Sequence, residues 1–330
     1  MLKLLKFWLT NSRWVALPQS LTPALAAVAM ASTQADFSPF LAAFAVFGVC
    51  IAHLSMNLFD DYFDFKKNKP GVRDTLARAG LRARTGKCDY LISGKATARQ
   101  LLAAALIFGG LAGLCGVVIF IHRGFDVLWI VLATGVLGLA YSAEPLRLSY
   151  RGLGELTIGI IFGPLLVTGV YVSAAGVFAP QAVIIGAALG LLVTNILYTH
   201  SVLDLDADLS VGKLTLAGII PGQSGKLAVS FCLMLLPYAI VLAGAGGGLL
   251  SHWYLLTMLT LPLAGALIYS MLEFCRNPDK PVTRRLWYGP MTRWEEITAE
   301  SLDWFMLRWY LARNLITAFA VLVIIAAFLE

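Results

Sequence analysis

Charged side chains are scarce in this sequence. Only 13% of its 330 residues are Asp, Glu, Lys or Arg, whereas 59% are hydrophobic. A soluble globular domain carries about 25% charged residues, so the composition excludes that class and predicts an integral membrane protein. The apolar runs are continuous and about 20 residues long, which predicts transmembrane helices and excludes the shorter, alternating strands of a β-barrel.

We therefore expect an all-α polytopic membrane protein, a bundle of about nine transmembrane helices that forms a single domain over residues 1–330. The first apolar segment is long enough to span and eight more follow, which argues against a cleaved signal peptide. The predicted spans are 14–33, 39–58, 100–121, 126–143, 153–174, 182–203, 226–245, 252–272 and 309–329.

Cysteines are few and are not arranged as a metal or redox site. The five cysteines show no Cys-x-x-Cys spacing and are expected to be free thiols. The net charge of +6 comes without a basic patch interleaved with aromatic residues, so we expect no nucleic-acid partner. The five are Cys50, Cys88, Cys115, Cys232 and Cys275.

Lysine and arginine predict the orientation of the bundle. With the N-terminus in the cytoplasm, all 25 basic residues except Arg123 fall on the cytoplasmic side of the predicted spans. The long connections 59–99, 204–225 and 273–308 then face the cytoplasm, and the Trp-rich connection 273–308 is expected to lie partly along the membrane interface. We predict a bacterial-type cytoplasmic membrane location, with the active site toward the cytoplasm.

Two acidic stretches stand out because carboxylates are otherwise rare. They hold six of the 19 acidic residues and follow the second and sixth predicted spans. A charge at the bilayer centre costs roughly 2.5–3.5 kcal/mol, so these groups must be in water or bound to a cation. The first stretch contains Asp60, Asp61 and Asp64, and the second contains Asp204, Asp206 and Asp208.

Helical spacing selects which of these carboxylates can act together. If the second helix continues beyond its span, Asn57, Asp61, Asp64 and Asn68 share one face. Asp204 and Asp208 also share a face, and Asp206 points to nearly the opposite side. Oxygen donors favour Mg²⁺ or Ca²⁺ over zinc, and Mg²⁺ binds through a few carboxylates together with substrate phosphates. We therefore predict a Mg²⁺ site for a diphosphate, with Asp61, Asp64, Asp204 and Asp208 as ligands.

Simpler interpretations compete with this one. Carboxylates at a helix end can be merely solvated or paired with Lys66, Lys67 or Lys213, although two clusters on one side favour a shared site. The 204–208 spacing resembles the start of a calcium loop, but Leu209 and Thr215 replace its required Gly and Glu. A cation-coupled transporter is disfavoured because transporters place their charges near the midplane, not at one surface.

Further candidates surround these stretches. Lys213 is expected to neutralise a departing diphosphate, and aromatic rings near the same surface, including Tyr150 and Phe162, are suited to stabilise a carbocation. Polar residues inside apolar spans are functional candidates by default, although helix–helix hydrogen bonds explain many of them. The candidate substrate-binding residues are Asn57, Asp60, Lys67, Asn68, Tyr141, Arg147, Arg151, Asn195, Tyr198 and His200.

Three groups of motifs stand out: Asn57-Leu58 through Lys67 with Ser93-Gly94-Lys95; Tyr141-Ser142, Pro145, Tyr150 through Glu155 and Phe162-Gly163-Pro164-Leu165; and Asp204, Asp208, Gly212-Lys213 and Thr215-Leu216-Ala217. Together they resemble the UbiA superfamily of intramembrane prenyltransferases, and within it most nearly the 1,4-dihydroxy-2-naphthoate polyprenyltransferase branch. The chain departs from that pattern at Asp60, where Asn is usual, at Asn68, where a third Asp is frequent, and at 200–203, where the branch favours Asn-Asn-x-Arg.

The resemblance implies a UbiA-like fold and a Mg²⁺-dependent transfer of a polyprenyl group from an allylic diphosphate to an aromatic acceptor. The branch implies 1,4-dihydroxy-2-naphthoate as the acceptor in menaquinone biosynthesis. Another aromatic compound or a lipid alcohol stays open as the acceptor, because the departures lie in the motifs. The surrounding membrane lipid is the other expected partner, and neither the prenyl chain length nor the oligomeric state follows from the sequence.

Overall fold

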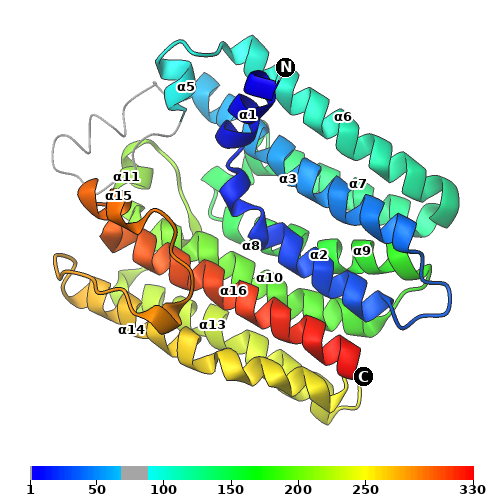
Figure 1. Cartoon of the computed structure of the whole chain (residues 1–330). Coiled ribbons are helices and arrows are strands. Elements are labelled where there is room, and N and C mark those ends of the chain that lie inside the picture. The colour runs from blue at the N-terminus through cyan, green and yellow to red at the C-terminus, as the bar shows by residue number, and fades with distance from the viewer. Residues whose placement is uncertain (1, 68–87) are drawn as a thin grey trace.

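The computed structural model of the chain describes residues 2–67 and 88–330, and every named element in these ranges is helical (Figure 1). Among the described residues, the isolated bridges comprise a single parallel pairing of Arg151 with Leu214. The elements are α1 (Leu2–Asn11), η1 (Trp14–Ala16), α2 (Pro18–Ala31), α3 (Pro39–Lys67), α5 (Asp89–Ile92), α6 (Ala98–Arg123), α7 (Phe125–Ser142), η2 (Leu148–Tyr150), α8 (Gly154–Ile160), η3 (Ile161–Leu165), α9 (Leu166–Ala175), α10 (Pro180–Leu203), α11 (Leu205–Ser210), α12 (Leu216–Ile219), α13 (Gly222–Gly246), η4 (His252–Thr260), α14 (Leu261–Arg276), η5 (Leu286–Tyr288), α15 (Trp294–Ala299) and α16 (Asp303–Leu329).

Eight helical segments in the described part of the chain are long and apolar enough to cross a membrane, and they correspond to eight of the nine predicted spans. The remaining one, 14–33, is instead formed by η1 followed by α2, which has only 14 residues. Such a helix rises about 21 Å, less than the roughly 30 Å of a hydrocarbon layer. The all-α membrane architecture is confirmed, and the number nine stays a prediction.

Helix α10 occupies the centre of the bundle. Its most apolar stretch is 72% buried, against 22% for α7. It packs against α13, α16, α8 and the η3 turn, whereas α6 lies mainly against α3. The continuously apolar surface of α7 and much of that of α6 therefore face outward, where the surrounding lipid would cover them.

A distorted turn brings α8 and α9 close to α10. The η3 turn has π-helical geometry, with a non-helical backbone at Gly163 and a proline at position 164 that has no amide proton to donate. A Cβ added to Gly190 of α10 would lie 2.5 Å from the Gly159 carbonyl oxygen. Small residues let membrane helices approach this closely, so glycine is needed where α8 and α10 cross.

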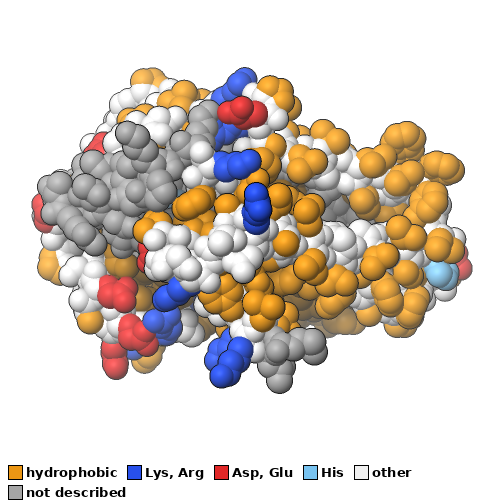
Figure 2. All heavy atoms as spheres, turned by 90° about the horizontal axis from the view of Figure 1, so that it is seen from above, with side chains coloured by type: hydrophobic (Ala, Val, Ile, Leu, Met, Phe, Trp, Pro, Cys, Tyr) orange, Lys and Arg blue, Asp and Glu red, His pale blue; other side chains and the backbone are white. Residues whose placement is uncertain are grey.

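The acid-bearing ends of the long helices lie at one end of the bundle. Helix α3 continues to Lys67, so Asp60, Asp61 and Asp64 lie on the helix itself. This continuation is the condition under which Asp61 and Asp64 are expected to share one helix face. The short helices α5, α11 and α15 lie at this same end, opposite the C-terminus (Figure 1). Figure 2 shows the charged side chains concentrated toward one end of the face in view, while the other end is almost entirely apolar.

The connection between α14 and α16 folds back along α16. The amide of Asn314 donates to the Tyr288 carbonyl at 2.8 Å, and the hydroxyl of Tyr310 donates to the Thr292 carbonyl at 2.7 Å. Leu286 at the tip is 95% exposed, and its neighbour Trp287 is 52% exposed. A short helix, α15, follows residue 293, and the interfacial role of this connection stays a prediction.

Candidate active site

Asp60 and Asp61 of the first acidic stretch are held by donors from three other parts of the chain. Arg13, between α1 and η1, donates through Nη2 to Asp61 Oδ1 at 3.0 Å and to Asp60 Oδ2 at 3.3 Å. Tyr90 of α5 donates its hydroxyl to Asp61 Oδ2 at 3.0 Å, and Ser142 of α7 donates to Asp60 Oδ1 at 3.0 Å. Asp61 is only 3% exposed, and a buried charge requires partners of this kind.

Electrostatics keep both donors to Asp61 protonated. Burial by itself would lower the pKa of Arg13, but attraction to Asp61 and Asp60 outweighs that effect, and the pKa of Arg13 is raised. Burial, reinforced by the negative charge of Asp61, raises the pKa of Tyr90 well above its ordinary value. Tyr90 therefore remains a hydrogen-bond donor even in moderately alkaline solution.

Asp64 is tied to the connection between α7 and α8. The hydroxyl of Tyr150 donates to Asp64 Oδ1 at 2.8 Å, and the guanidinium carbon of Arg147 lies 3.8 Å from the centre of the Tyr150 ring. Arg147 is 5% exposed, and its Nη2 has no hydrogen-bond partner among the described residues. A buried guanidinium with an unused donor is suited to an anionic ligand, because leaving such a donor unsatisfied is costly.

The second acidic stretch turns two carboxylates inward. Asp204 and Asp208 are 6% and 4% exposed, whereas Asp206 is exposed to solvent. This is the distribution that the helical spacing predicts. Beyond α11, the backbone amide of Lys213 donates to the Asp208 carbonyl at 2.8 Å, which brings the lysine back beside the end of that helix.

One connection, residues 143–153, contacts both the first acidic stretch and the chain that follows the second. Tyr150 links it to Asp64 of α3. On its other side, the amide of Gly152 donates to the Leu214 carbonyl at 2.7 Å, next to the bridge between Arg151 and Leu214. Leu214 lies six residues beyond Asp208, so the connection links the first acidic stretch to the chain that leads out of the second.

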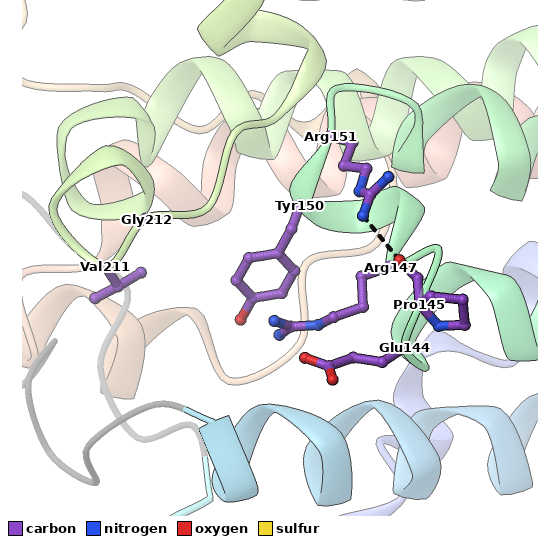
Figure 3. Close-up of a pocket in the computed structure, with 7 residues that line it drawn as sticks. All are labelled: Glu144, Pro145, Arg147, Tyr150, Arg151, Val211 and Gly212. Atoms are coloured by element: carbon purple, nitrogen blue, oxygen red, sulfur yellow. Dashed lines mark hydrogen bonds between the residues drawn. The ribbon is translucent and has the colours of Figure 1, made fainter.

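A cavity of about 590 Å³ opens at this connection (Figure 3). The side chains of Arg147 and Tyr150 point into it side by side, and Val211 and Gly212 face them from the connection after α11. Arg151 is exposed and donates to the Pro145 carbonyl at 2.8 Å. Planar guanidinium groups are the preferred partners of phosphate oxygens. The residues that line the cavity are Glu144, Pro145, Arg147, Tyr150, Arg151, Val211 and Gly212.

The donor set fits a metal that arrives with its substrate. No three His, Cys, Asp or Glu side chains in the described ranges are grouped so as to hold a metal ion unaided. Mg²⁺, however, is usually bound by one or two carboxylates together with substrate phosphates and water. The buried carboxylates of the two acidic stretches could provide the oxygens, and the unused Arg147 donor beside the cavity suits a phosphate.

Several predicted substrate-binding residues use their side chains within the bundle. The amide of Asn57 donates to the Ser12 carbonyl at 2.9 Å, and the hydroxyl of Tyr198 donates to the Lys226 carbonyl at 3.1 Å. The His200 ring lies 5.1 Å from that of Phe305 on α16. These contacts position helices, and a direct role for these residues in binding substrate stays a prediction.

The remaining predicted residues differ in their surroundings. Asn195 is fully buried, and its amide has no hydrogen-bond partner within the described part of the chain. Tyr141 is half-buried beside Gly154, where an added Cβ would lie 3.3 Å from the tyrosine ring. Lys67 ends α3, but its side chain and the whole of Asn68 lie outside the described residues.

Sequence reasoning missed Arg13, Tyr90 and Ser142 as partners of the acidic stretch. From the sequence, Arg13 counts only among the basic residues that mark the cytoplasmic side, although it directly precedes the first apolar span. Tyr90 is 29 residues away from Asp61, and Ser142 is 82 residues away from Asp60. No local spacing rule connects residues so far apart, although Ser142 stands within a motif that carries the family resemblance.

The described part of the chain is thus an all-helical bundle with buried carboxylates on α3 and around α11 and an arginine-lined cavity at the same end. Residues 20–294 match the model of the UbiA prenyltransferase family, and the chain belongs to that family. It is therefore a prenyltransferase and an integral membrane protein, as predicted.

Known proteins resemble the chain in both sequence and fold. It is 26% identical over 240 residues to the 1,4-dihydroxy-2-naphthoate octaprenyltransferase of Bacillus subtilis, covering 71% of each chain. A solved structure of a UbiA homologue from Archaeoglobus fulgidus, bound to GPP and Mg²⁺, has a TM-score of 0.56 at 15% identity, over 96% of this chain and 99% of that one. A structure described as digeranylgeranylglyceryl phosphate synthase has a TM-score of 0.60 at 17% identity, over 99% of each chain.

Proposed function

We propose that this prenyltransferase transfers a polyprenyl group from an allylic diphosphate to 1,4-dihydroxy-2-naphthoate, in menaquinone biosynthesis. The observation that carries the diphosphate assignment is the buried Arg147, whose Nη2 has no partner among the described residues. It lines a cavity between the connection 143–153 and residues 211–212, which follow the second acidic stretch. The acceptor assignment is supported by similarity to the naphthoate octaprenyltransferase of Bacillus subtilis.

The residues around the cavity have distinct tasks in this proposal. Arg147 and Lys213 bind the diphosphate and stabilise the negative charge that it gains on departure. The bond between the allylic carbon and the diphosphate oxygen breaks, and its electron pair stays on the oxygen. A ring carbon of the acceptor then forms the new carbon–carbon bond, and the acceptor loses its carboxyl group as CO₂. The apolar bundle keeps water away from the allylic cation.

The carboxylates serve the metal. Bound Mg²⁺ would neutralise diphosphate oxygens and make the diphosphate a better leaving group. The residues that would hold it are Asp61, Asp64, Asp204 and Asp208. Tyr150 and Tyr90 orient two of these carboxylates through the hydrogen bonds described above, in the way that outer-shell partners fix metal ligands.

Other acceptors form the alternative within the same chemistry. A different aromatic compound or a lipid alcohol would use the same diphosphate site, because the carboxylates and arginines described above do not contact the acceptor in this scheme. A cation-coupled transporter is the alternative outside it, and family membership disfavours that function.

The proposal is tested by incubating the purified protein with geranylgeranyl or a longer prenyl diphosphate, Mg²⁺ and a panel of aromatic acids, and identifying the product by mass. We expect decarboxylated prenyl-naphthoquinol, and no product after removal of Mg²⁺ with EDTA. Replacing Asp61 or Asp208 with Asn should lower turnover by roughly 100-fold or more.

Asp206→Asn provides the matched control, because Asp206 lies on α11 between the two inward-facing carboxylates but is exposed. It should retain near-normal turnover. Normal turnover of the Asp61 and Asp208 variants would refute the site assignment. Prenylation of a different acceptor with naphthoate left untouched would refute the acceptor alone.

A further inference from the structure

Glu155 is a buried carboxylate that the chemistry described above does not use. It is the second residue of α8 and is 4% exposed. The hydroxyl of Ser201 donates to its Oε1 at 2.5 Å, and the backbone amide of Leu216 donates to Oε1 at 3.1 Å and to Oε2 at 3.2 Å. Among the described residues, no lysine or arginine forms an ion pair with it.

The two donors to Glu155 lie at opposite ends of one functional segment. Ser201 comes three residues before Asp204, and Leu216 comes three residues after Lys213. Between them lie both inward-facing carboxylates of the second acidic stretch and the lysine. A single side chain from α8 thus joins the end of α10 to the start of α12 and closes the segment that carries these groups.

The middle of the segment is partly open to solvent. Leu209, Ser210, Gly212 and Leu214 are all exposed. Its second anchor is the backbone contact between Gly152 and Leu214, which comes from the same short stretch of chain as Glu155. Residues 151–155 therefore contact the segment at 214–216 in two ways, through the backbone bridge that includes the Gly152 hydrogen bond and through the Glu155 carboxylate.

We propose that Glu155 is a positioning residue, which sets the separation of the two ends of 201–216 and thereby holds Asp204, Asp208 and Lys213 in place to bind a Mg²⁺–diphosphate complex. This inference rests on the proposed function for the identity of the ligand. The reach of the side chain and its acceptor oxygen carry the effect, since both donors contact Oε1. A glutamine keeps that oxygen and that length, whereas an aspartate keeps the charge but is one methylene shorter.

The test compares Glu155→Gln, Glu155→Asp and Glu155→Ala in detergent-purified protein, with Glu295→Ala as a control carboxylate exposed on α15. Calorimetry measures the affinity for inorganic pyrophosphate in the presence of Mg²⁺, and kinetics give KM separately for prenyl diphosphate and for acceptor. We expect the Ala and Asp variants to bind pyrophosphate at least about tenfold more weakly and to show a matching rise in the KM for prenyl diphosphate. The Gln variant should stay within about threefold of the unmodified protein on both measures, and the KM for acceptor should hardly change in any variant.

Three outcomes overturn the inference. Unchanged pyrophosphate affinity in the Ala and Asp variants would exclude positioning. An impaired Gln variant beside a normal Asp variant would assign the effect to charge. A fall of the apparent kcat in proportion to the folded fraction, with both KM values unchanged, would indicate a purely structural role. If Glu155→Ala does not fold, the Asp and Gln pair still decides, and failure of the unmodified protein to bind Mg²⁺ and pyrophosphate would instead count against the proposed function.

Discussion

Two arginines at the candidate site have left-handed backbone conformations. Arg13 has φ of 60° and Arg147 has φ of 42°. Such a conformation costs a non-glycine residue about 1–3 kcal/mol and persists only where its surroundings fix it. Arg13 is fixed by Asp60 and Asp61, and Arg147 packs on Tyr150. A basic residue that only set the orientation of the protein in the membrane would need no such contact. Each of these two arginines therefore has a specific structural role at the site.

Arg147→Lys should show that the shape of the guanidinium matters as well as its charge. Lysine keeps the positive charge but loses the flat face that stacks on Tyr150 and the fork that grips phosphate. Losing a charge-assisted hydrogen bond costs about 1.5–3 kcal/mol, so kcat/KM for the prenyl diphosphate should fall roughly 10- to 100-fold. Pyrophosphate release measures this. Arg284→Lys, at an exposed arginine, is the control, and equal rates for both variants would contradict the role of Arg147.

Tyr90→Phe should weaken Mg²⁺ binding without a marked pH dependence of its own. The change removes the hydroxyl that orients Asp61, so the Mg²⁺ concentration for half-maximal activity should rise about tenfold. An ordinary tyrosine would lose half of its donor protons at about pH 10. Because the pKa of Tyr90 is raised, the ratio between the two proteins should stay constant from about pH 7.5 to pH 10. Convergence of the two Mg²⁺ requirements near pH 10 would show that the hydroxyl ionises normally.

At the scale of elements, the packing of α8 and α9 against α10 positions the site. The η3 turn seats Gly163 and Pro164 against Gly186 and Gly190 of α10. Helix α8 begins directly after the connection that bears Arg147 and Tyr150, and α10 leads directly into Asp204. The backbone contact between these helices therefore sets the relative positions of the cavity wall and the second acidic stretch.

Gly190→Ala should destabilise the protein. Its Cβ would lie 2.5 Å from the Gly159 carbonyl oxygen, so two helix backbones must separate. Overpacking of this kind costs about 1–3 kcal/mol, and the apparent midpoint of thermal unfolding in detergent should fall by several degrees. In contrast, Gly116→Ala on α6 meets no atom within 4 Å and should leave the midpoint unchanged or raise it slightly, because alanine favours a helix. A similar response of both variants would contradict the close crossing.

At the scale of the whole molecule, the two ends of the bundle differ in charge. The acidic stretches, both site arginines and α15 lie at one end (Figure 1). Arg123, the basic residue predicted to lie outside, donates to the carbonyls of Ser173, Ala174 and Asp36. It thus caps the end of α9, which gives a structural reason for an arginine at the end of the bundle opposite the other basic residues.

Site-directed labelling tests the predicted orientation. In a cysteine-free background, Leu249→Cys in the turn after α13 and Lys280→Cys after α14 place single thiols at exposed positions on opposite ends of the bundle. In right-side-out vesicles, an impermeant maleimide should label position 249 directly and position 280 only after permeabilisation, since the basic side is expected inside. The reverse pattern would place the active site on the outer face.

The sequence by itself determined the class of architecture and the positions of eight membrane helices, because a helix must match the bilayer thickness and satisfy its own backbone. It also determined that Asp204 and Asp208 turn inward while Asp206 does not, because helical periodicity is a local property. Only the tertiary structure decided that the first span is broken into η1 and a short α2, and that Arg13, Tyr90 and Tyr150 grip the first acidic stretch. These contacts join residues 48, 29 and 86 positions apart, and such pairs are set by how the helices pack, which no local pattern specifies.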